Sequence, residues 1–398
     1  MIEARYLLAL NVLCYRDTKD AHGFDRLWQK DLQEHLRYLS HVTLASPCAP
    51  MRPGEYGGID SPRLHYRDLP RPSSFGHALM QLPLTLWRLW KATGEAAIVH
   101  TCVAGWPIPM GWLATPLAKW RGKQLVIVVE SAPWRLFPGG PASWRARLRA
   151  AVFERASRWC LRQADLVVVT QDGYRSLVAD GKSCHTIPAA WIDEETVLSD
   201  AAAQKAWAEK LAAPPELLYA GRLEPSKGVR TLLEAMEILA GRRVAIRLTI
   251  IGEGSLRNEC ESAARRSSGT VEIRVHPPIA YGDEFFDFLR RHRALVTPSL
   301  SDEQPRIVYD AFSQAVPVIA SDTPGLSRSI RAGVTGLLVP AGDAAAWADQ
   351  LAACARDLGQ CREMGLAAVA EARANTHQEM HRRRARLLEA MLPTKPTC

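Results

Sequence analysis

One stretch in the second half of the chain places two cations between an apolar run and a helical pattern. Residues 217–235 read LLYAGRLEPSKGVRTLLEA: a strand is expected to end at Gly221, a loop carries Arg222 and Lys227, and a helix is expected to begin near Gly228. Ligands of open α/β sheets bind at the carboxyl ends of strands. A planar guanidinium and an ammonium point charge there suit a phosphate or diphosphate. The alternative is a solvated basic turn.

A second stretch places acids around the start of another helix. A strand is expected over Ala294–Thr297, and a helix near Pro305, because proline is favoured at the first helical position. Asp302 precedes that helix and Asp310 lies inside it. Carboxylates so placed could accept hydrogen bonds from sugar hydroxyls or stabilise developing positive charge. The alternative is that Asp302 caps the helix and Asp310 faces solvent.

Both stretches belong to a regular alternation of short apolar runs and longer helical patterns. Near-continuous apolar runs are typical of parallel strands covered on both faces, and their alternation with helices predicts doubly wound α/β sheets. Two sets of about six strands favour two Rossmann-like units over one large sheet. The expected strands are Tyr6–Leu13, His41–Ala45, Ala97–His100, Gln124–Val129, Leu166–Thr170, His185–Ile187, Glu216–Tyr219, Ala245–Ile251, Val271–His276, Ala294–Thr297, Pro317–Ala320 and Gly336–Val339.

The 398-residue chain is expected to divide near Asp193–Pro215, where acidic and alanine-rich segments precede two prolines and a new strand. We therefore predict an amino-terminal domain over 1–200, completed by a carboxyl-terminal helix over 375–398, and a second domain over 213–374. The segment Pro47–Ser74 is rich in Pro, Gly, Arg and Tyr and is expected to be a long loop of the first domain. Such a loop is either functional or a plain insertion.

The two charged stretches, in this order, resemble the retaining GT-B glycosyltransferases of family 4, the glycosyltransferase group 1 type. The family pattern G-R-L-x-P-x-K-G is matched by GRLEPSKG over 221–228. Further familiar segments are IGEGSL over 251–256, PSLS over 298–301, PVIASD over 317–322 and GVTGLLVP over 333–340. The resemblance is dense from about 216 to 345 and loose over the amino-terminal half.

The resemblance implies two Rossmann-like doubly wound parallel-sheet domains that face each other across a cleft. It also implies that Arg222 and Lys227 hold the donor diphosphate and stabilise its leaving charge, so that no metal and no cofactor is required. The family's paired acids fall on Asp302, at the donor sugar, and Asp310, at the ribose; each is one methylene shorter than the family's Glu. The other donor-binding positions that it implies are Gly221, Gly252, Glu253, Pro277, Ile279, Glu303, Gln304, Pro305 and Arg306.

The amino-terminal half departs from the family pattern. Only Gly23 is available where the family's first loop usually carries a glycine pair near the phosphates. Glu130 stands where a histidine often follows the strand, and it could take an acceptor-side role or cap the next segment. His100, at the end of an expected strand, is either a cleft residue or a core histidine.

Composition excludes several classes of protein. With 47% hydrophobic and 23% charged residues the chain is globular, not disordered, collagen-like or coiled-coil.

The net charge of +8 comes from residues 1–200 and 373–398, which favours an anionic acceptor or membrane surface over nucleic acid. The arginine-rich helix expected over 144–162 could lie on an anionic membrane or be an ordinary packing helix. We expect a cytoplasmic protein, with peripheral attachment to the inner face of the cell membrane as an option.

The nine cysteines show neither a C-x-x-C pair nor zinc-type spacing with histidine. They are expected to be reduced, buried, small apolar residues, and no metal site is predicted.

The predicted function is retaining hexosyl transfer from a UDP-, GDP- or ADP-sugar to a glycan or lipid-linked acceptor, in cell-surface glycan or exopolysaccharide assembly. One alternative is a catalytically impaired GT-B protein that binds nucleotide sugars as a scaffold, suggested by the absent histidine and the two shortened acids. A nucleotide-sugar epimerase on the same fold is disfavoured by the loop of Arg222 and Lys227.

Overall fold

A computed structural model describes residues 1–18, 20–50, 56–135, 143–211, 215–267, 269–300 and 306–392. The chain divides into two compact units. The amino-terminal unit comprises the described residues of 1–188 and 380–392, and the carboxyl-terminal unit those of 189–379. The expected domains, over 1–200 with 375–398 and over 213–374, put the first boundary slightly later in the chain and the return to the first unit slightly earlier.

A nine-stranded sheet forms the centre of the described part of the amino-terminal unit. Its order is β3-β2-β4-β1-β6-β7-β8-β9, and β5 also pairs with β4. Neighbouring strands are parallel, except that β2 and β3 are antiparallel. The strands are β1 (Ile2–Ala9), β2 (Cys14–Arg16), β3 (His22–Gly23), β4 (Leu39–Pro50), β5 (Leu64–Leu69), β6 (Ile98–Cys102), β7 (Gln124–Val129), β8 (Leu166–Val169) and β9 (Cys184–Thr186).

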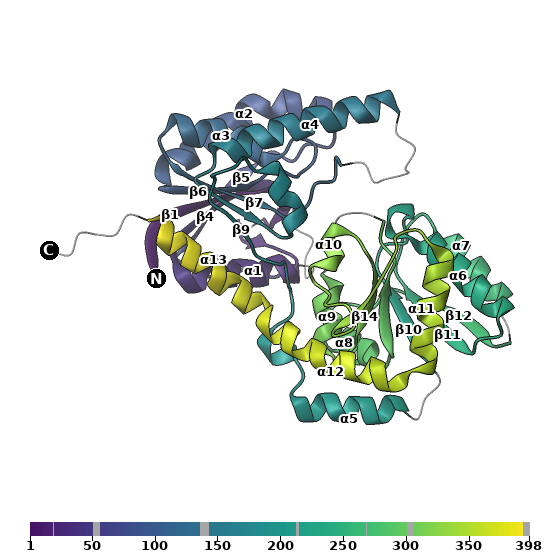
Figure 1. Cartoon of the computed structure of the whole chain (residues 1–398). Coiled ribbons are helices and arrows are strands. Elements are labelled where there is room, and N and C mark those ends of the chain that lie inside the picture. Colours follow the sequence, from purple (N-terminus) through teal and green to yellow (C-terminus); the bar gives the residue numbers. More distant parts are fainter. Residues whose placement is uncertain are drawn as a thin grey trace. The chain divides into compact units, whose positions relative to one another are not determined.

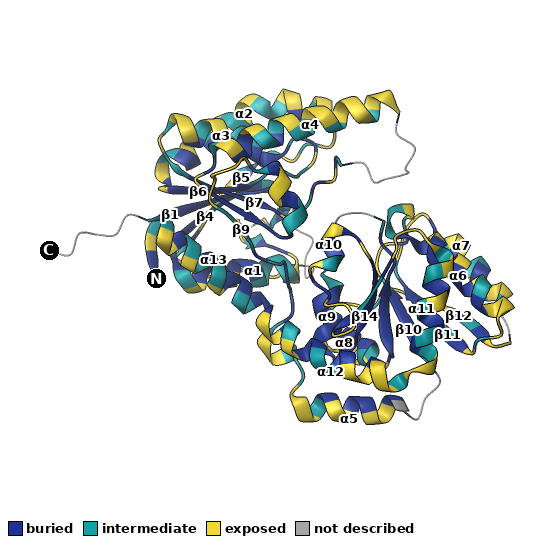
Figure 2. Ribbon diagram, viewed as in Figure 1, coloured by how far each residue is buried: buried dark blue, intermediate teal, exposed yellow. Residues whose placement is uncertain are grey.

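Helices cover both faces of this sheet (Figure 1). Along β7, Leu125 and Ile127 pack with side chains of α2, α3 and α4, whereas Val126 and Val128 pack in the core that receives α1 and α13. Successive side chains of a strand point to opposite faces, so the strands are buried on both sides, dark blue in Figure 2. The helices are α1 (Arg26–Tyr38), α2 (Phe75–Glu95), α3 (Met110–Trp120), α4 (Trp144–Gln163) and α13 (His377–Met391), with a 3₁₀ turn over Asp172–Leu177.

In the described part of the carboxyl-terminal unit, the sheet has six parallel strands, ordered β12-β11-β10-β13-β14-β15. Its strands are β10 (Glu216–Ala220), β11 (Ile246–Ile251), β12 (Val271–His276), β13 (Ala294–Thr297), β14 (Val318–Ser321) and β15 (Gly336–Val339). Its helices are α5 (Asp200–Leu211), α6 (Val229–Gly241), α7 (Arg257–Arg266), α8 (Asp283–Arg290), α9 (Ile307–Ser313), α10 (Pro324–Ser327), α11 (Ala344–Arg356) and α12 (Leu358–Ala374), with 3₁₀ turns over Glu194–Thr196 and Pro225–Lys227.

The expected fold class is confirmed: both units are Rossmann-like, with parallel sheets between helices. The strands Gln124–Val129, Val271–His276, Ala294–Thr297 and Gly336–Val339 have the expected bounds. The expectation of a long loop over Pro47–Ser74 was wrong, because β4 extends to Pro50 and β5 lies within that segment. As an edge strand β5 is largely polar, so it lacks the continuous apolar run of a central strand.

Candidate functional site

Three loops of the carboxyl-terminal unit meet beyond the ends of β10, β11 and β13. The backbone N–H of Leu223 donates to the carbonyl of Glu253 at 2.8 Å, and that of Leu300 to the carbonyl of Ser226 at 2.9 Å. These hydrogen bonds join the loop after β10 to the loops that follow the two neighbouring strands. The site expected from sequence is therefore assembled at the carboxyl edge of the sheet, where open α/β sheets bind ligands.

Glycines allow these loops to approach so closely. Gly228 has φ +68°, and a Cβ there would lie 1.8 Å from the carbonyl oxygen of Pro298. Gly252 has φ +149°, and a Cβ there would lie 1.9 Å from the carbonyl oxygen of Gly221. The structure thus brings the expected glycines 221 and 252 together, backbone against backbone.

Arg222 and Lys227 lie on the first of these loops, as expected. The Tyr219 hydroxyl donates to the Arg222 carbonyl at 2.7 Å, which holds the backbone just after β10. Arg222 is exposed, and Lys227 is half-buried at the end of the 3₁₀ turn before α6. Gly228, the N-cap of α6, provides no side-chain cap, so this edge offers two cations beside the first backbone N–H groups of a helix.

Acidic side chains of the same loops are held by neighbours. Hydrogen bonds from the Oγ and N–H of Ser255, at 2.7 and 3.1 Å, lower the pKa of the Glu224 carboxyl. Glu253, expected to bind the donor, pairs through its carboxylate with Arg257 at 3.0 Å. Glu253 therefore contributes its backbone to the loop junction, while its side chain pairs with the first residue of α7, the helix that follows.

The segment with the expected donor-binding residues Pro277 and Ile279 follows β12. Pro277 is exposed and Ile279 is half-buried. In the same segment, the Tyr281 hydroxyl donates to Asp310 Oδ1 at 2.9 Å. Burial, with the Asp310 carboxylate, raises the pKa of Tyr281, so the phenol keeps its proton. Asp310 is only 5% exposed, so the alternative that it faces solvent was wrong.

Several of the residues expected to bind the donor lie in the loop before α9. Asp302, Glu303, Gln304 and Pro305 lie outside the described residues. Arg306, the next residue, places its guanidinium over the ring of Trp191, 4.8 Å from the ring centroid. Trp191 in turn stacks on His377, with 5.0 Å between ring centroids.

The amino-terminal unit contains a pocket of about 590 Å³. His100 and Glu130, both expected from sequence, line it together, whereas Gly23 is not among its lining residues. Gly23 is buried in β3, opposite Tyr15 of β2. Aromatic and polar side chains line the pocket, among them Trp28, Trp106, Trp134, Phe153, Asp31, His35, Arg149 and Arg384.

Asp31 and His35 of this lining belong to a buried polar network that also includes His381. His381 Nε2 lies 3.1 Å from one oxygen of Asp31, and His35 Nδ1 lies 3.2 Å from the other. Burial alone would raise the pKa of Asp31, but the two histidines hold it well below its usual value. Arg384, with its side chain 8% exposed, lies 3.8 Å from the Glu130 carboxylate.

His100 belongs to the same network. It is 5% exposed, its Nδ1 lies 3.0 Å from the Tyr6 hydroxyl, and burial lowers its pKa well below the usual value. His100 is therefore a core histidine that also borders the pocket. Sequence reasoning missed Asp31, His35 and Arg384, because helices α1 and α13 bring them together from opposite ends of the chain, without any local pattern.

Within the described residues, no helix is both long and apolar enough to cross a bilayer.

Comparisons with known proteins bear on both units. The family model described as Glycosyl transferases group 1 matches residues 214–357. A D-inositol 3-phosphate glycosyltransferase of Xylanimonas cellulosilytica is 31% identical over 223 residues, which are 52% of this chain and 52% of that protein. One of Arthrobacter sp. strain FB24 is 34% identical over 159 residues, 39% of this chain and 38% of that protein. The chain thus spans about half the length, or less, of these relatives.

Solved structures match almost the whole chain. Sucrose-phosphate synthase from Thermosynechococcus elongatus superposes with a TM-score of 0.71 at 19% identity, over 97% of this chain and 99% of that chain. Anabaena HepE in complex with UDP superposes with a TM-score of 0.67 at 14% identity, over 97% of this chain and 100% of that chain. At such identities the likeness concerns the fold. Residues 214–357 therefore form a domain of the Glycosyl transferases group 1 family, in a chain with the fold of GT-B glycosyltransferases.

Proposed function

We propose that the chain is a retaining, metal-independent glycosyltransferase that moves a sugar from a nucleotide-diphosphate donor to an acceptor hydroxyl. The observation that carries the proposal is the placement of Arg222 and Lys227 at the carboxyl edge of the sheet, on a loop clamped through Gly228 and Gly252. Anabaena HepE has been solved with UDP and with UDP-glucose, which supports a nucleotide sugar as the donor class.

The proposed chemistry needs charge stabilisation at two places. When the bond from the anomeric carbon to the diphosphate breaks, negative charge grows on the leaving oxygens and positive charge on the sugar ring. Arg222 and Lys227 are proposed to stabilise the negative charge on the leaving oxygens. Because these cations are already in place, they need no reorganisation during the reaction. Asp302 and Asp310 are proposed at the sugar and the ribose. In a front-face route, the leaving phosphate accepts the proton of the acceptor hydroxyl as the new bond forms on the same face.

The pocket of the amino-terminal unit is proposed to bind the acceptor. Its tryptophan walls offer flat apolar faces to sugar rings, and its polar groups can orient hydroxyls. Arg149 and Arg384 line it as well, which favours an acceptor that carries negative charge. Glu130, at the rim and 39% exposed, is proposed to contact the acceptor. These features support a glycan or lipid-linked acceptor in cell-surface glycan or exopolysaccharide assembly.

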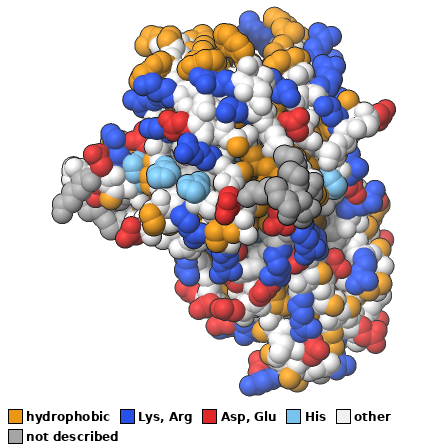
Figure 3. Space-filling view, turned by 90° about the vertical axis from the view of Figure 1, so that its left-hand side faces the viewer, with side chains coloured by type: hydrophobic (Ala, Val, Ile, Leu, Met, Phe, Trp, Pro, Cys, Tyr) orange, Lys and Arg blue, Asp and Glu red, His pale blue; other side chains and the backbone are white. Residues whose placement is uncertain are grey.

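Peripheral membrane attachment is proposed through helices α2 and α4. On α4, Trp144, Leu148, Val152 and Trp159 are between 42% and 69% exposed, and helical spacing places them on one stripe. On α2, the exposed apolar residues include Met80, Leu84 and Trp87. Figure 3 shows apolar side chains along the upper edge, over these helices, with Lys and Arg between them. Apolar residues among cations are typical of surfaces that bind anionic lipid.

Lys227→Ala tests the proposed function. Purified protein is screened for binding and slow hydrolysis of UDP-, GDP- and ADP-sugars without added divalent cations, and the best donor is used with acceptors. Removing one charge-stabilising donor typically costs about 10²- to 10³-fold in turnover, so Lys227→Ala should lose at least about 100-fold while its unfolding temperature stays unchanged. Lys205→Ala, which removes an exposed lysine of α5, is the matched control.

Several outcomes are informative. The anomeric configuration of the product, measured by NMR, should equal that of the donor. Absence of binding and hydrolysis with every nucleotide sugar would overturn the enzyme proposal, and unchanged turnover in Lys227→Ala would overturn the diphosphate assignment. Donor binding without hydrolysis or transfer would instead support the scaffold alternative.

A further inference from the structure

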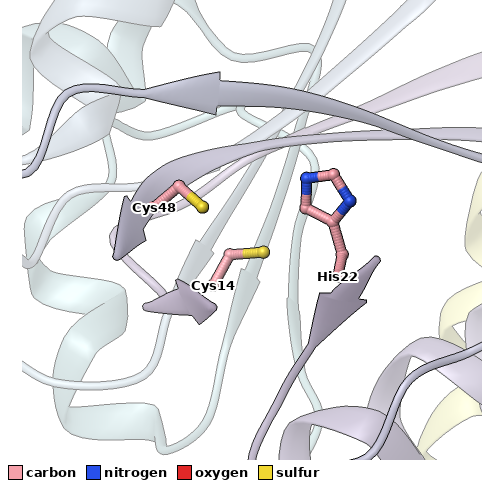
Figure 4. A group of neighbouring side chains, drawn as sticks. All are labelled: Cys14, His22 and Cys48. Atoms are coloured by element: carbon pink, nitrogen blue, oxygen red, sulfur yellow. The ribbon is translucent and has the colours of Figure 1, made fainter. Parts of the chain in front are cut away.

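A group of metal-ligating side chains lies at one edge of the amino-terminal sheet. Cys14, His22 and Cys48 come from β2, β3 and β4, and each points into the same small space (Figure 4). Their ligand atoms all lie within 4.8 Å of one another. The sequence shows no zinc-type spacing and predicted no metal site, because these three residues are far apart in the chain and come together only when the strands pair.

The strand register explains why these side chains converge. Cys14 is the register partner of Cys48 across the parallel pair β2·β4, so the two side chains leave the same face of the sheet. His22 is the partner of Arg16, two residues after Cys14 on β2. It therefore shares that face, since side chains two residues apart on a strand point the same way.

A fourth potential ligand, Asp68, comes from β5 and lies just outside the group whose ligand atoms are all within 4.8 Å of one another. Asp68 is the partner of Ser46, two residues before Cys48 on β4, and so lies on the same face. Its Oδ1 lies 2.8 Å from His22 Nε2, and its Oδ2 lies 2.9 Å from the Arg16 guanidinium. The side chains of His22 and Asp68 are only 12% and 18% exposed.

The imidazole is held in place from one side. The ring of Tyr66, also on β5, stacks on that of His22 with 4.0 Å between centroids. This stacking limits rotation of the imidazole ring.

We propose that Cys14, Cys48, His22 and Asp68 bind one Zn²⁺ ion. Two sulfurs, one imidazole nitrogen and one carboxylate oxygen make the four-coordinate set that Zn²⁺ prefers, and thiolate ligands select it over Mg²⁺ or Ca²⁺. Zn–S bonds of about 2.3 Å place two sulfurs of a tetrahedral site about 3.8 Å apart, which is compatible with ligand atoms that lie within 4.8 Å of one another.

Protons and charge balance in this site. On binding, each thiol loses its proton to solvent, because the thiolate is the form that binds Zn²⁺. Two thiolates, one carboxylate and one divalent ion leave a single negative charge. The Arg16 guanidinium at 2.9 Å from Asp68 compensates that charge.

Such a site would tie the β2–β3 hairpin to the sheet. β2 and β3 have only three and two residues, too few for backbone pairing alone to hold them firmly. The metal would cross-link them to β4 and β5. This role is separate from the proposed sugar transfer, which we propose to be metal-independent.

The test uses the full chain, purified under reducing conditions and dialysed against Zn²⁺, with bound metal measured by mass spectrometry. One equivalent of Zn²⁺ per chain is expected. Co²⁺ put in its place should show the thiolate-to-metal charge-transfer band and the visible bands of a tetrahedral site. Cys14→Ser and Cys48→Ser should lose both, and Asp68→Asn should weaken Zn²⁺ binding by about 10- to 100-fold.

Cys184→Ser is the matched control, because it removes another half-buried thiol on the same sheet, in β9. It should keep one equivalent and the Co²⁺ spectrum. Wild type that binds no Zn²⁺ above background, or a disulfide between Cys14 and Cys48 that persists in the reduced protein, would overturn the proposal. So would equal binding by Cys14→Ser, whose fold is checked by its unfolding temperature without metal.

Discussion

At the scale of single residues, two glycines of one helix show what the loop junction demands. Gly228 begins the α6 region with φ +68°, and a Cβ there would meet a backbone oxygen at 1.8 Å. Gly241 ends the same helix, and a Cβ there would meet nothing within 4 Å. The first glycine is required by close backbone approach, whereas the second only fills a helical position.

Gly228→Ala is expected to lower the free energy of unfolding by about 1–3 kcal/mol, since it combines an unfavourable left-handed conformation with a backbone clash. Nucleotide-sugar binding should weaken with it, because Lys227 is the preceding residue. Gly241→Ala should leave stability unchanged or raise it by about 0.5–1 kcal/mol. Denaturant unfolding of both variants measures the difference in their free energies of unfolding. Equal effects of the two substitutions would contradict the conclusion that close backbone approach requires a glycine at position 228.

The buried histidines predict a pH dependence of stability. Burial lowers the pKa of both His100 and His381. The charged or polar side chains near these two histidines include Tyr6, His35, Asp31 and Arg384. Unfolded histidine takes up a proton near pH 6.5, so the unfolded state binds more protons below that pH. The free energy of unfolding should therefore fall as pH drops from about 7 to 5, by at most about 1.4 kcal/mol per pH unit for each histidine.

His100→Asn should flatten this slope, because asparagine does not titrate and its amide can replace Nδ1 toward Tyr6. The slope is measured by denaturant unfolding at pH 7, 6 and 5. His185→Asn removes an exposed histidine of the same unit and should keep the wild-type slope. A wild-type stability that rises on acidification would contradict the prediction.

At the scale of elements, α4 combines an apolar stripe with arginines. Glu154 pairs with Arg135 and Arg158, whereas Leu148 and Arg155 are exposed. Helix α4 packs against the unit through buried residues such as Ser157, Cys160 and Leu161. Its outer side is thus left for another partner, for which we propose an anionic membrane.

Leu148→Glu should lower pelleting with anionic vesicles at low salt by at least about fivefold. One charge near an anionic surface is worth about 1 kcal/mol, and apolar burial is lost as well. Val334→Glu makes the same kind of change at an exposed residue of the carboxyl-terminal unit and should bind like wild type. If the wild-type protein pelleted equally with neutral and anionic vesicles, lipid charge would not contribute to membrane binding and this part of the proposal would be refuted.

At the scale of the whole molecule, the last helix completes the first unit. From Met380 onward, α13 belongs to the amino-terminal unit, and Met380 and Leu388 are buried in a core with residues of β1, β4 and α1. Arg384 of the same helix lines the pocket. The stability of the amino-terminal unit and its proposed acceptor site therefore both depend on residues of α13, which lie far from residues 1–188 in the sequence.

Leu388→Ala should destabilise the amino-terminal unit by about 2–5 kcal/mol, because it leaves a cavity in this core. Hydrogen exchange should quicken in β1, β4 and α1 while β10–β15 stay protected, since the two units have separate cores. Glu389→Ala changes an exposed neighbour and should leave exchange unchanged. Faster exchange in both sheets alike would mean that the units unfold together.

The sequence by itself determined those features that are written in contiguous residues. The runs of β7, β12, β13 and β15 carry a local apolar signal, and the loop of Arg222 and Lys227 lies within one strand–loop–helix segment. Its glycines, spaced as the resemblance implied, meet other backbones where the fold requires it.

Only the tertiary structure decided the rest. The pocket combines residues from α1, β6, β7 and α13, and the cluster of Cys14, His22 and Cys48 depends on the register of β2, β3 and β4. Pairing register and helix return are properties of contacts between distant segments, formed because they bury apolar surface together. No periodicity within one segment records them. Local chemistry was therefore readable from the chain, while chemistry shared between segments required the fold.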